Sequence, residues 1–274
     1  MIIFFDLDDT LYDRATPFIQ TYRKIYGDIS DDKGHRLYEA CNRRGDQVFL
    51  PSQRGDISME QMYIYRYCNG FTDMGLTLTA KEALDFQKVY RQMQKEIVPA
   101  PGVISALVRA KDAFEAVGII TNGPSDNQRE KINTLRLSEW IESDLIIISK
   151  EVGAPKPSPE IFTAAAEAAG KFRLKQSNSF VIDKGCNAKG EEPVADRVCN
   201  VEEKGPAIVD ICQPHEFIMV GDSLDKDIEP AIKLGWHTVW LNINKETPRP
   251  DIRPERTISS MEEFLPQLIT STQN

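Results

Sequence analysis

The chain has 274 residues, of which 41% are hydrophobic and 27% are charged, and its 42 acidic and 33 basic side chains give a net charge of −9. This composition is typical of one large or two small globular domains and excludes a chain that is disordered throughout. An acidic chain has no general attraction for a nucleic-acid polymer or an anionic membrane, so neither is an expected partner.

Targeting signals and cysteines bear on where the protein works. No stretch approaches the roughly 20 apolar residues of a membrane span, and the short apolar run at the N-terminus lacks the basic flank of a signal peptide. The five cysteines are few and odd in number, which fits a reducing compartment better than a disulfide framework. These features predict a cytoplasmic protein.

Five short apolar runs have the length and composition of buried parallel strands. They are Ile2–Phe5, Val117–Ile120, Leu145–Ile148, Phe217–Val220 and Thr238–Leu241. Helical patterns lie between them. One starts with a capping box at Ser125–Gln128, and another starts at Ser158-Pro159 and is expected to end at Gly170. Strands that alternate with helices predict an α/β fold class with a Rossmann-like, three-layer parallel-sheet core.

Residues 14–97 break this alternation, because apolar and aromatic side chains recur there at helical spacing and no convincing strand run appears. The pattern predicts an all-α helical cap domain inserted into the core. The core is then composed of residues 1–13 and 98–274.

A second irregular region lies inside the predicted core. It spans about residues 171–213, is polar and contains several glycines and prolines. Ser179–Ile182 and Pro206–Ile211 each have the composition of a short strand, and a loop without regular structure is the alternative.

The strongest chemical signal follows the first strand, where Asp6 and Asp8 stand two residues apart. Two carboxylates at this spacing can share a divalent cation, with one acting as nucleophile and the other moving protons. An Asp-rich turn without chemistry is the alternative for this motif alone.

Three further polar segments follow or connect strands. Thr121-Asn122-Gly123 offers a hydroxyl, an amide and backbone N–H groups to phosphoryl oxygens. Lys156 is held between two prolines in a loop that enters a helix, and the acidic turn that begins at Gly221-Asp222 suits a hard cation such as Mg²⁺. Each segment alone is also compatible with an ordinary loop.

Taken in this order, the four segments resemble the haloacid dehalogenase-like (HAD) hydrolase superfamily. The motifs that carry the resemblance are Asp6-x-Asp8-x-Thr10, Thr121, Lys156 and Gly221-Asp222-Ser223-x-x-x-Asp227. The stretch from Thr121 through Gln128 to Lys131, with the position of the helical insertion, is similar to the phosphatase branch whose α-helical cap follows the first strand. That branch includes pyrimidine nucleotidases and N-acylneuraminate-9-phosphatases.

The resemblance implies a Mg²⁺-dependent phosphatase that hydrolyses a small phosphorylated metabolite, such as a nucleotide, a sugar phosphate or a flavin precursor, through an aspartyl-phosphate. In that mechanism Asp6 is the nucleophile and Asp8 is the general acid and then the general base. Mg²⁺ is held by Asp6, by the backbone carbonyl of Asp8 and by Asp222.

The resemblance also implies how the phosphoryl group is bound. Its oxygens would contact Thr121, Asn122, Gly123 and Lys156. Lys156 would in addition favour the ionised form of Asp6, because a nearby positive charge lowers the pKa of a carboxyl group. The implied supporting residues are Thr10, which shapes the nucleophile loop, and Asp227, which orients Lys156 or the metal ligands.

Substrate choice is expected to come from the cap, because the core motifs all address the phosphoryl group. Arg54 precedes a predicted turn between cap helices and is the first choice for a substrate contact, ahead of Arg43, Arg44 and Arg66. The natural substrate and the oligomeric state remain open at this point.

Two other functions compete with the phosphatase. A phosphomutase would use the same core with a different cap, and a non-catalytic binding domain would need only the fold. Hydrolytic dehalogenation is disfavoured, because it needs neither a leaving-group acid nor a metal. The ligand types of a zinc site occur in Cys186, Cys199, Cys212 and His215, but the spacing lacks a close cysteine pair and favours ordinary thiols.

Overall fold

The structure is a computed structural model that describes residues 1–183 and 212–266, with backbone alone for 178–183. One sheet of six parallel strands has the order β3-β2-β1-β4-β5-β6. The strands are β1 (Ile2–Phe5), β2 (Ala116–Thr121), β3 (Ile146–Ile148), β4 (Phe217–Gly221), β5 (His237–Leu241) and β6 (Arg256–Ile258). The predicted α/β class and its five strands are confirmed, whereas β6 was not predicted.

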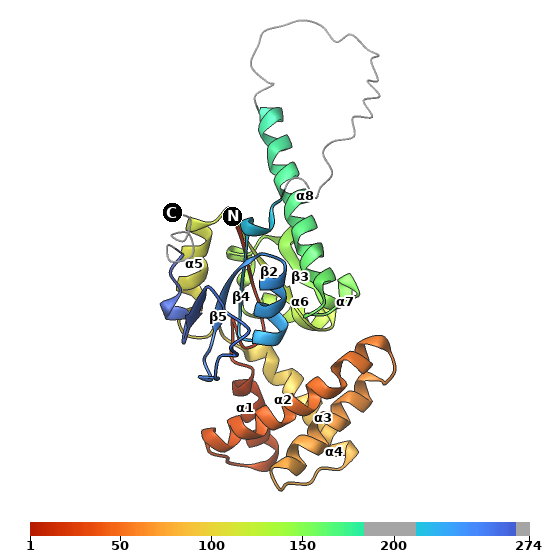
Figure 1. Cartoon of the computed structure of the whole chain (residues 1–274). Helices are drawn as coiled ribbons and strands as arrows, with labels where there is room; N and C mark the ends of the chain where they lie inside the picture. Colours follow the sequence, from red (N-terminus) through yellow and green to blue (C-terminus); the bar gives the residue numbers. More distant parts are fainter. Residues whose placement is uncertain (184–211, 267–274) are drawn as a thin grey trace, which may run out of the picture.

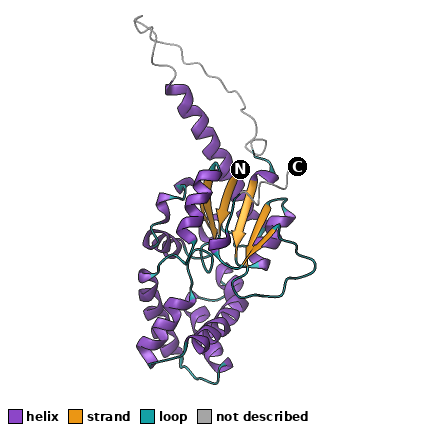
Figure 2. Ribbon diagram, turned by 90° about the vertical axis from the view of Figure 1, so that its left-hand side faces the viewer, coloured by secondary structure: helices purple, strands orange, loops and turns teal. Residues whose placement is uncertain are grey.

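Two hydrophobic layers cover the sheet, and β1 contributes to both. Ile3 and Phe5 pack into the cluster that contains α5 (Val103–Ala113). Ile2 and Phe4 point to the opposite face and join the cluster under α8 (Pro159–Asp183). Side chains alternate in this way because successive residues of a strand face opposite sides. Figure 2 shows the resulting three layers, with helices on both sides of the strands.

Four helices form a separate bundle within residues 14–97. They are α1 (Ala15–Tyr26), α2 (Asp31–Arg54), α3 (Met59–Asp73) and α4 (Ala80–Met93), followed by the 3₁₀ turn η1 (Gln94–Glu96). Capping boxes at Ser58 and Thr79 start α3 and α4. The bundle has its own aromatic core, which includes Phe18, Phe71 and Phe86. Figure 1 shows it at one end of the core, opposite the projecting end of α8.

The remaining helical elements are short and connect the strands. They are α6 (Ser125–Thr134), η2 (Leu137–Glu139), η3 (Ser143–Leu145), α7 (Ser149–Val152), η5 (Pro214–Glu216), the π-helical turn η6 (Leu224–Ile228), α9 (Glu229–Lys233) and η7 (Met261–Glu263). Pro230 lies in the first turn of α9, where its missing N–H has no helical partner to lose. No helix within residues 1–183 and 212–266 is both long and apolar enough to cross a membrane.

The end of α8 corrects two predictions. Gly170 does not end the helix, and Ser179–Ile182 is helical rather than a strand, because α8 continues to Asp183. Tertiary contacts stabilise the turns that follow Gly170. Phe172 is buried against the sheet, and Arg173 forms ion pairs with Glu115 and Glu216. The predicted strand Pro206–Ile211 and most of the polar region lie outside the described residues.

Candidate active site

The polar loops predicted to carry chemistry meet at one edge of the sheet. Strands β2, β1 and β4 are neighbours and parallel, so the loops that follow them lie side by side. Figure 2 shows the strands pointing toward the helical bundle. There, a cavity of about 850 Å³ is lined by Asp6, Asp8, Lys156 and Asp222 from the core and by side chains of the bundle. Ligands of open α/β sheets bind at this edge, where the strand order changes direction.

Lys156 joins two carboxylates in the floor of the cavity. Its Nζ donates to Asp6 Oδ1 at 2.5 Å, to Asp227 Oδ1 at 2.6 Å and to the carbonyl of Ile120 at 2.9 Å. The other oxygen of Asp227 accepts from the N–H of Ser223 at 3.1 Å. All three donors of the ammonium group are therefore used, and one of them is held by Asp227.

Gly221 is needed for this arrangement. A Cβ atom on Gly221 would lie 2.4 Å from Asp227 Oδ2, which is far closer than real Cβ contacts. Only glycine leaves space for the Asp227 carboxylate at this strand end.

The pKa values reflect burial and crowding of charge. Burial raises the pKa of Asp6, and although Lys156 lowers it, the neighbouring carboxylates of Asp227 and Asp8 raise it further. Burial would lower the pKa of Lys156, but Asp227 and Asp6 outweigh this and raise it. Lys156 thus acts on Asp6 in the expected direction but does not offset burial by itself.

Asp222 is the carboxylate with the least compensation. It forms no ion pair with any residue that the structure describes, and its Oδ1 accepts from the hydroxyl of Thr10 at 3.4 Å. The same hydroxyl lies 3.3 Å from Asp6 Oδ2, so Thr10 lies within reach of both carboxylates. Burial and the charges of Asp6 and Asp9 raise the pKa of Asp222 well above its ordinary value.

The donor set fits a divalent cation. Oxygens of Asp6, Asp222 and Asp227 lie within 4.8 Å of one another. The carboxylates at this end of the cavity are Asp6, Asp8, Asp9, Asp222 and Asp227, and their ion-pair partners are Lys156, Lys131 and Arg14. Two of these five negative charges are left without a cationic partner, and one divalent cation would balance them. Carboxylate oxygens are the ligands that Mg²⁺ prefers.

Asp8 is held on three sides by residues that were not predicted to belong to the site. Its Oδ1 accepts from Lys131 Nζ at 2.7 Å and from the hydroxyl of Tyr12, and its Oδ2 accepts from Gln128 Nε2 at 2.9 Å. Burial would raise the pKa of Asp8, but Lys131, Arg14 and these hydrogen bonds outweigh burial and hold it well below its ordinary value. Asp8 is therefore ionised in this arrangement.

The predicted capping box at Ser125–Gln128 is wrong, because the Gln128 side chain contacts Asp8. Helix α6 begins at Ser125 with Pro124 as its N-cap, and the Ser125 hydroxyl bonds to Glu151 instead of capping the helix. The Gln128 side chain is thereby free to turn inward, toward Asp8 and Thr121. The repeat of polar residues at Gln128 and Lys131, three positions apart on a helix, was the available signal for a shared inward face.

The residues predicted to bind phosphate follow β2, and their polar groups form hydrogen bonds within the protein. Thr121 is fully buried, and its hydroxyl accepts from Gln128. Asn122 lines the cavity, and its amide exchanges two hydrogen bonds with the backbone of Lys156, at 2.8 and 2.9 Å. The N–H of Gly123 donates to Ser149 Oγ at 3.0 Å. Asn122 therefore holds the backbone of Lys156, and Gly123 holds the start of α7 (Ser149–Val152).

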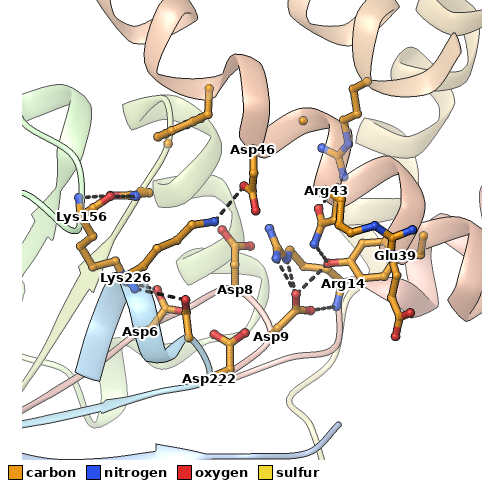
Figure 3. Close-up of a pocket in the computed structure, with 18 of the residues that line it drawn as sticks. Asp6, Asp8, Asp9, Arg14, Glu39, Arg43, Asp46, Lys156, Asp222 and Lys226 are labelled. Atoms are coloured by element: carbon orange, nitrogen blue, oxygen red, sulfur yellow. Dashed lines mark hydrogen bonds and ion pairs between the residues drawn. The ribbon is translucent and has the colours of Figure 1, made fainter. Parts of the chain in front are cut away.

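Arg54 is not brought to the site. Its side chain is 68% exposed, pairs with Asp56, and is absent from the lining of the cavity. Arg44 likewise pairs with Asp73, whereas Arg43 and Arg66 do line the cavity. Figure 3 shows Arg43 across the cavity from Asp6, and Lys226 reaching from the core to Asp46 of α2.

The proposed zinc ligands are only partly described. Cys186 and Cys199 lie outside the described residues. Cys212 accepts a hydrogen bond from Arg173 at 3.3 Å, and His215 is exposed. The described residues give no support to a zinc site.

Comparison with known proteins supports the reading of the motifs. The family model of the haloacid dehalogenase-like hydrolases matches residues 1–187, and a HAD-hydrolase-like model matches residues 153–264. The pyrimidine 5'-nucleotidase YjjG of Escherichia coli is 28% identical over 264 residues, with 96% of this chain and 95% of the relative covered. The N-acylneuraminate-9-phosphatase of Homo sapiens is 23% identical over 284 residues, with 98% and 93% covered.

A solved structure extends the comparison to the fold. The HAD-hydrolase YfnB from Bacillus subtilis, bound to magnesium, has a TM-score of 0.61 at 18% identity and covers 96% of this chain and 95% of its own. The strand order, the aspartates at the strand ends and the family match along the first two thirds of the sequence agree. The chain belongs to the haloacid dehalogenase-like hydrolase family, in its phosphatase branch.

Proposed function

We propose that the protein is a Mg²⁺-dependent phosphatase that hydrolyses a small phosphorylated metabolite, such as a nucleotide, a sugar phosphate or a flavin precursor, through an aspartyl-phosphate. The observation that supports this most is the pairing of Asp6 with Lys156 at 2.5 Å beside an uncompensated Asp222. A carboxylate fixed by an ammonium group at the end of a central strand is placed to attack a bound phosphoryl group.

The first chemical step transfers the phosphoryl group to the protein. A carboxylate oxygen of Asp6 forms a bond to phosphorus, and the bond between phosphorus and the ester oxygen breaks. The departing oxygen takes a proton from Asp8 and leaves as an alcohol. Asp8 must be protonated for this step, so its contacts with Lys131 and Gln128 have to loosen when substrate binds.

The second step regenerates the protein. Asp8, now ionised, accepts a proton from a water molecule whose oxygen attacks phosphorus, and the bond from phosphorus to Asp6 breaks. Inorganic phosphate leaves and Asp6 is again a carboxylate. The ionised Asp8 of the structure, held by Lys131 and Gln128, corresponds to the form that acts as the base.

The cation and Lys156 have separate roles in this proposal. Mg²⁺, held by Asp6, Asp222 and the carbonyl of Asp8, would offset the repulsion between the carboxylates and the phosphoryl group. Lys156 would stay charged throughout, since Asp227 and Asp6 raise its pKa. It would place a positive charge next to the oxygen that attacks.

The size of the cavity supports a metabolite larger than phosphate alone. Its volume of about 850 Å³ includes a wall from the helical bundle, where Phe49, Met62 and Tyr63 lie. The relatives matched along most of their length are named as a pyrimidine 5'-nucleotidase and an N-acylneuraminate-9-phosphatase, whose substrates also combine a phosphate with a larger organic group.

The proposal is tested by following hydrolysis of p-nitrophenyl phosphate and trapping the phosphorylated protein by acid quench and mass spectrometry. Asp6→Asn should give neither product nor phosphoprotein. Asp8→Asn should still become phosphorylated but turn over about 10²–10⁴-fold more slowly, as expected when a general acid–base is removed. Near-normal turnover by Asp6→Asn, or release of halide from a 2-haloacid without phosphatase activity, would contradict the proposal.

A further inference from the structure

The cavity has two chemically different ends. Its core end holds the aspartates and Lys156, which address the phosphoryl group. Its other end is formed by helices α2, α3 and α4 of the bundle. A substrate that fills the cavity must therefore contact both ends, and the bundle end decides which leaving group fits.

Cationic side chains at the two ends differ in whether they are paired. The lysines and arginines that line the cavity are Arg14, Arg43, Arg66, Lys131, Lys156, Lys226 and Arg249. Five of them form ion pairs. Arg14 pairs with Asp9, Lys131 with Asp8, Lys156 with Asp6 and Asp227, Lys226 with Asp46, and Arg249 with Asp225 and Glu229. Among the residues that the structure describes, Arg43 and Arg66 form no ion pair, although Arg43 is close enough to Asp73 to help lower its pKa; both arginines belong to the bundle.

The Arg66 side chain packs among other side chains of the bundle. The side chain is partly buried, its guanidinium lies 5.2 Å from the centre of the Tyr67 ring, and Nη2 donates to Asn42 Oδ1 at 3.1 Å. Gly45 of α2 makes room for it, since a Cβ there would lie 3.2 Å from Arg66 Cδ. Its Nε is buried and has no acceptor among the described residues.

The unpaired charge of Arg66 is the informative feature. Buried or partly buried arginines are normally paired with carboxylates, because an isolated charge loses solvation without compensation. Besides burial, the largest effects on the pKa of Arg66 come from tyrosine and cysteine side chains and not from a carboxylate. A guanidinium held in place beside a cavity, with donors to spare, is suited to bind an anionic ligand group.

We infer that Arg66, assisted by Arg43, forms a subsite for a second anionic group on the substrate, either a carboxylate or a second phosphate. This inference rests on the proposed function, in which the core binds the phosphoryl group that reacts. Phe49, Met62 and Tyr63 line the same wall, so the part of the substrate that joins its two anions passes along apolar side chains. The subsite would make the enzyme prefer phosphate esters whose leaving group carries an anionic group over esters whose leaving group is neutral.

The test uses three series of straight-chain alkyl phosphates of increasing length. Their far ends carry a carboxylate, a phosphonate or a carboxamide, and the carboxamide matches the carboxylate in shape but has no charge. At the best length, kcat/KM for one anionic series should exceed that for the carboxamide by about tenfold or more, since a hydrogen bond to a charged group is stronger than to a neutral one. Comparing the carboxylate and phosphonate series identifies which anion the subsite prefers.

Variants then assign the preference to Arg66. In Arg66→Gln the ratio of kcat/KM between the charged and neutral esters should fall toward one, and Arg66→Lys should keep part of it. The ratio within one variant cancels any general loss of activity or folded protein. Arg36→Gln is the matched control, because Arg36 also lies in the bundle, pairs with Asp32 and does not line the cavity.

The outcomes separate this inference from the proposed function. Hydrolysis of p-nitrophenyl phosphate reports on the core, because that ester has no second anion. Activity toward p-nitrophenyl phosphate and all the alkyl esters, with equal kcat/KM for charged and neutral ends, would contradict the subsite and leave the phosphatase intact. A preference that survives in Arg66→Gln would contradict it as well. No hydrolysis of any ester would overturn the proposed function, and the subsite with it.

Discussion

At the scale of single residues, the immediate surroundings of Asp8 are as informative as the motif itself. Gln128 donates to Asp8 and also accepts from Lys131 Nζ at 2.8 Å, so one amide aligns both members of the ion pair. Asp8 is thereby fixed in one rotamer at the edge of the cavity. A proton donor and acceptor must lie within hydrogen-bond reach of the group it serves, so loss of this alignment should slow the reaction.

We therefore expect Gln128→Leu to lower kcat for p-nitrophenyl phosphate by roughly tenfold or more, but by less than the loss of Asp8 itself. Steady-state kinetics and thermal unfolding should be measured together. Asn133→Ala is the control, because Asn133 is exposed on the same helix. An unchanged kcat in a folded Gln128→Leu protein would show that Asp8 needs no alignment by this side chain.

Residues at the strand ends were predictable, whereas residues that reach them from helices were not. Asp6 and Asp222 directly follow apolar runs, and the parallel sheet brings such positions together without further information. The contact of Gln128 depends on how α6 is rotated about its axis, which local sequence does not specify. Arg54 was mispredicted because a turn was expected to face the site, but it faces solvent and Asp56.

At the scale of elements, the closest helix contact in the bundle is between α2 and α3. A Cβ on Gly70 would lie 2.5 Å from Cys41 Sγ and 2.6 Å from Cys41 Cα, so the two helices touch where Gly70 has no side chain. Burial raises the pKa of the Cys41 thiol to about 12, as expected for a group enclosed by this contact.

Gly70→Ala should force α2 and α3 apart and lower the free energy of unfolding by about 1–3 kcal/mol, the usual cost of overpacking a core. This sign is opposite to that of an ordinary glycine-to-alanine change within a helix, which stabilises. Chemical denaturation measures the difference. Glu60→Ala, on the exposed start of α3, should stay within about 0.5 kcal/mol, and a stabilised Gly70→Ala would contradict the close contact.

Helices and strands were predicted correctly where the local sequence pattern specifies them. The five strands with long apolar runs were found, but β6 has only Arg256–Ile258 and exists because it pairs with β5. The extension of α8 past Gly170 depends on partners far away in sequence, such as Glu115 and Asp144. Periodicity cannot show such contacts, and tertiary structure overrides a weak local stop.

At the scale of the whole molecule, the uncompensated charge of the site should make stability depend on the cation. If Mg²⁺ binds the folded form alone, as the proposed function requires, it should raise the unfolding free energy by about 2.7 kcal/mol at 100 times its Kd. Asp222→Asn should abolish this rise. It should also stabilise the metal-free protein, because burial and neighbouring carboxylates disfavour the ionised Asp222.

Thermal unfolding with EDTA and with MgCl₂ measures both effects independently of activity. Asp144→Asn removes the same charge from the surface, where Asp144 pairs with Lys175, and should respond to Mg²⁺ like the unmodified protein. Equal stabilisation of Asp222→Asn and the unmodified protein by Mg²⁺ would show that the cation binds elsewhere. Hydrolysis of p-nitrophenyl phosphate should stop in EDTA and return with Mg²⁺.

The position of β1 in the sheet has a consequence for biosynthesis. β1 is synthesised before the other strands of the sheet, yet Ile2 pairs with Ala116 on one side and with Phe217 on the other. The helices of the bundle end at Met93, before the partner strands begin at Ala116 and Phe217, so the bundle can pack its own core without them. Asp6, which follows β1, therefore reaches its final place only after β4 has been synthesised. Such distant pairing slows folding and leaves an apolar strand exposed in the nascent protein, where a chaperone would bind.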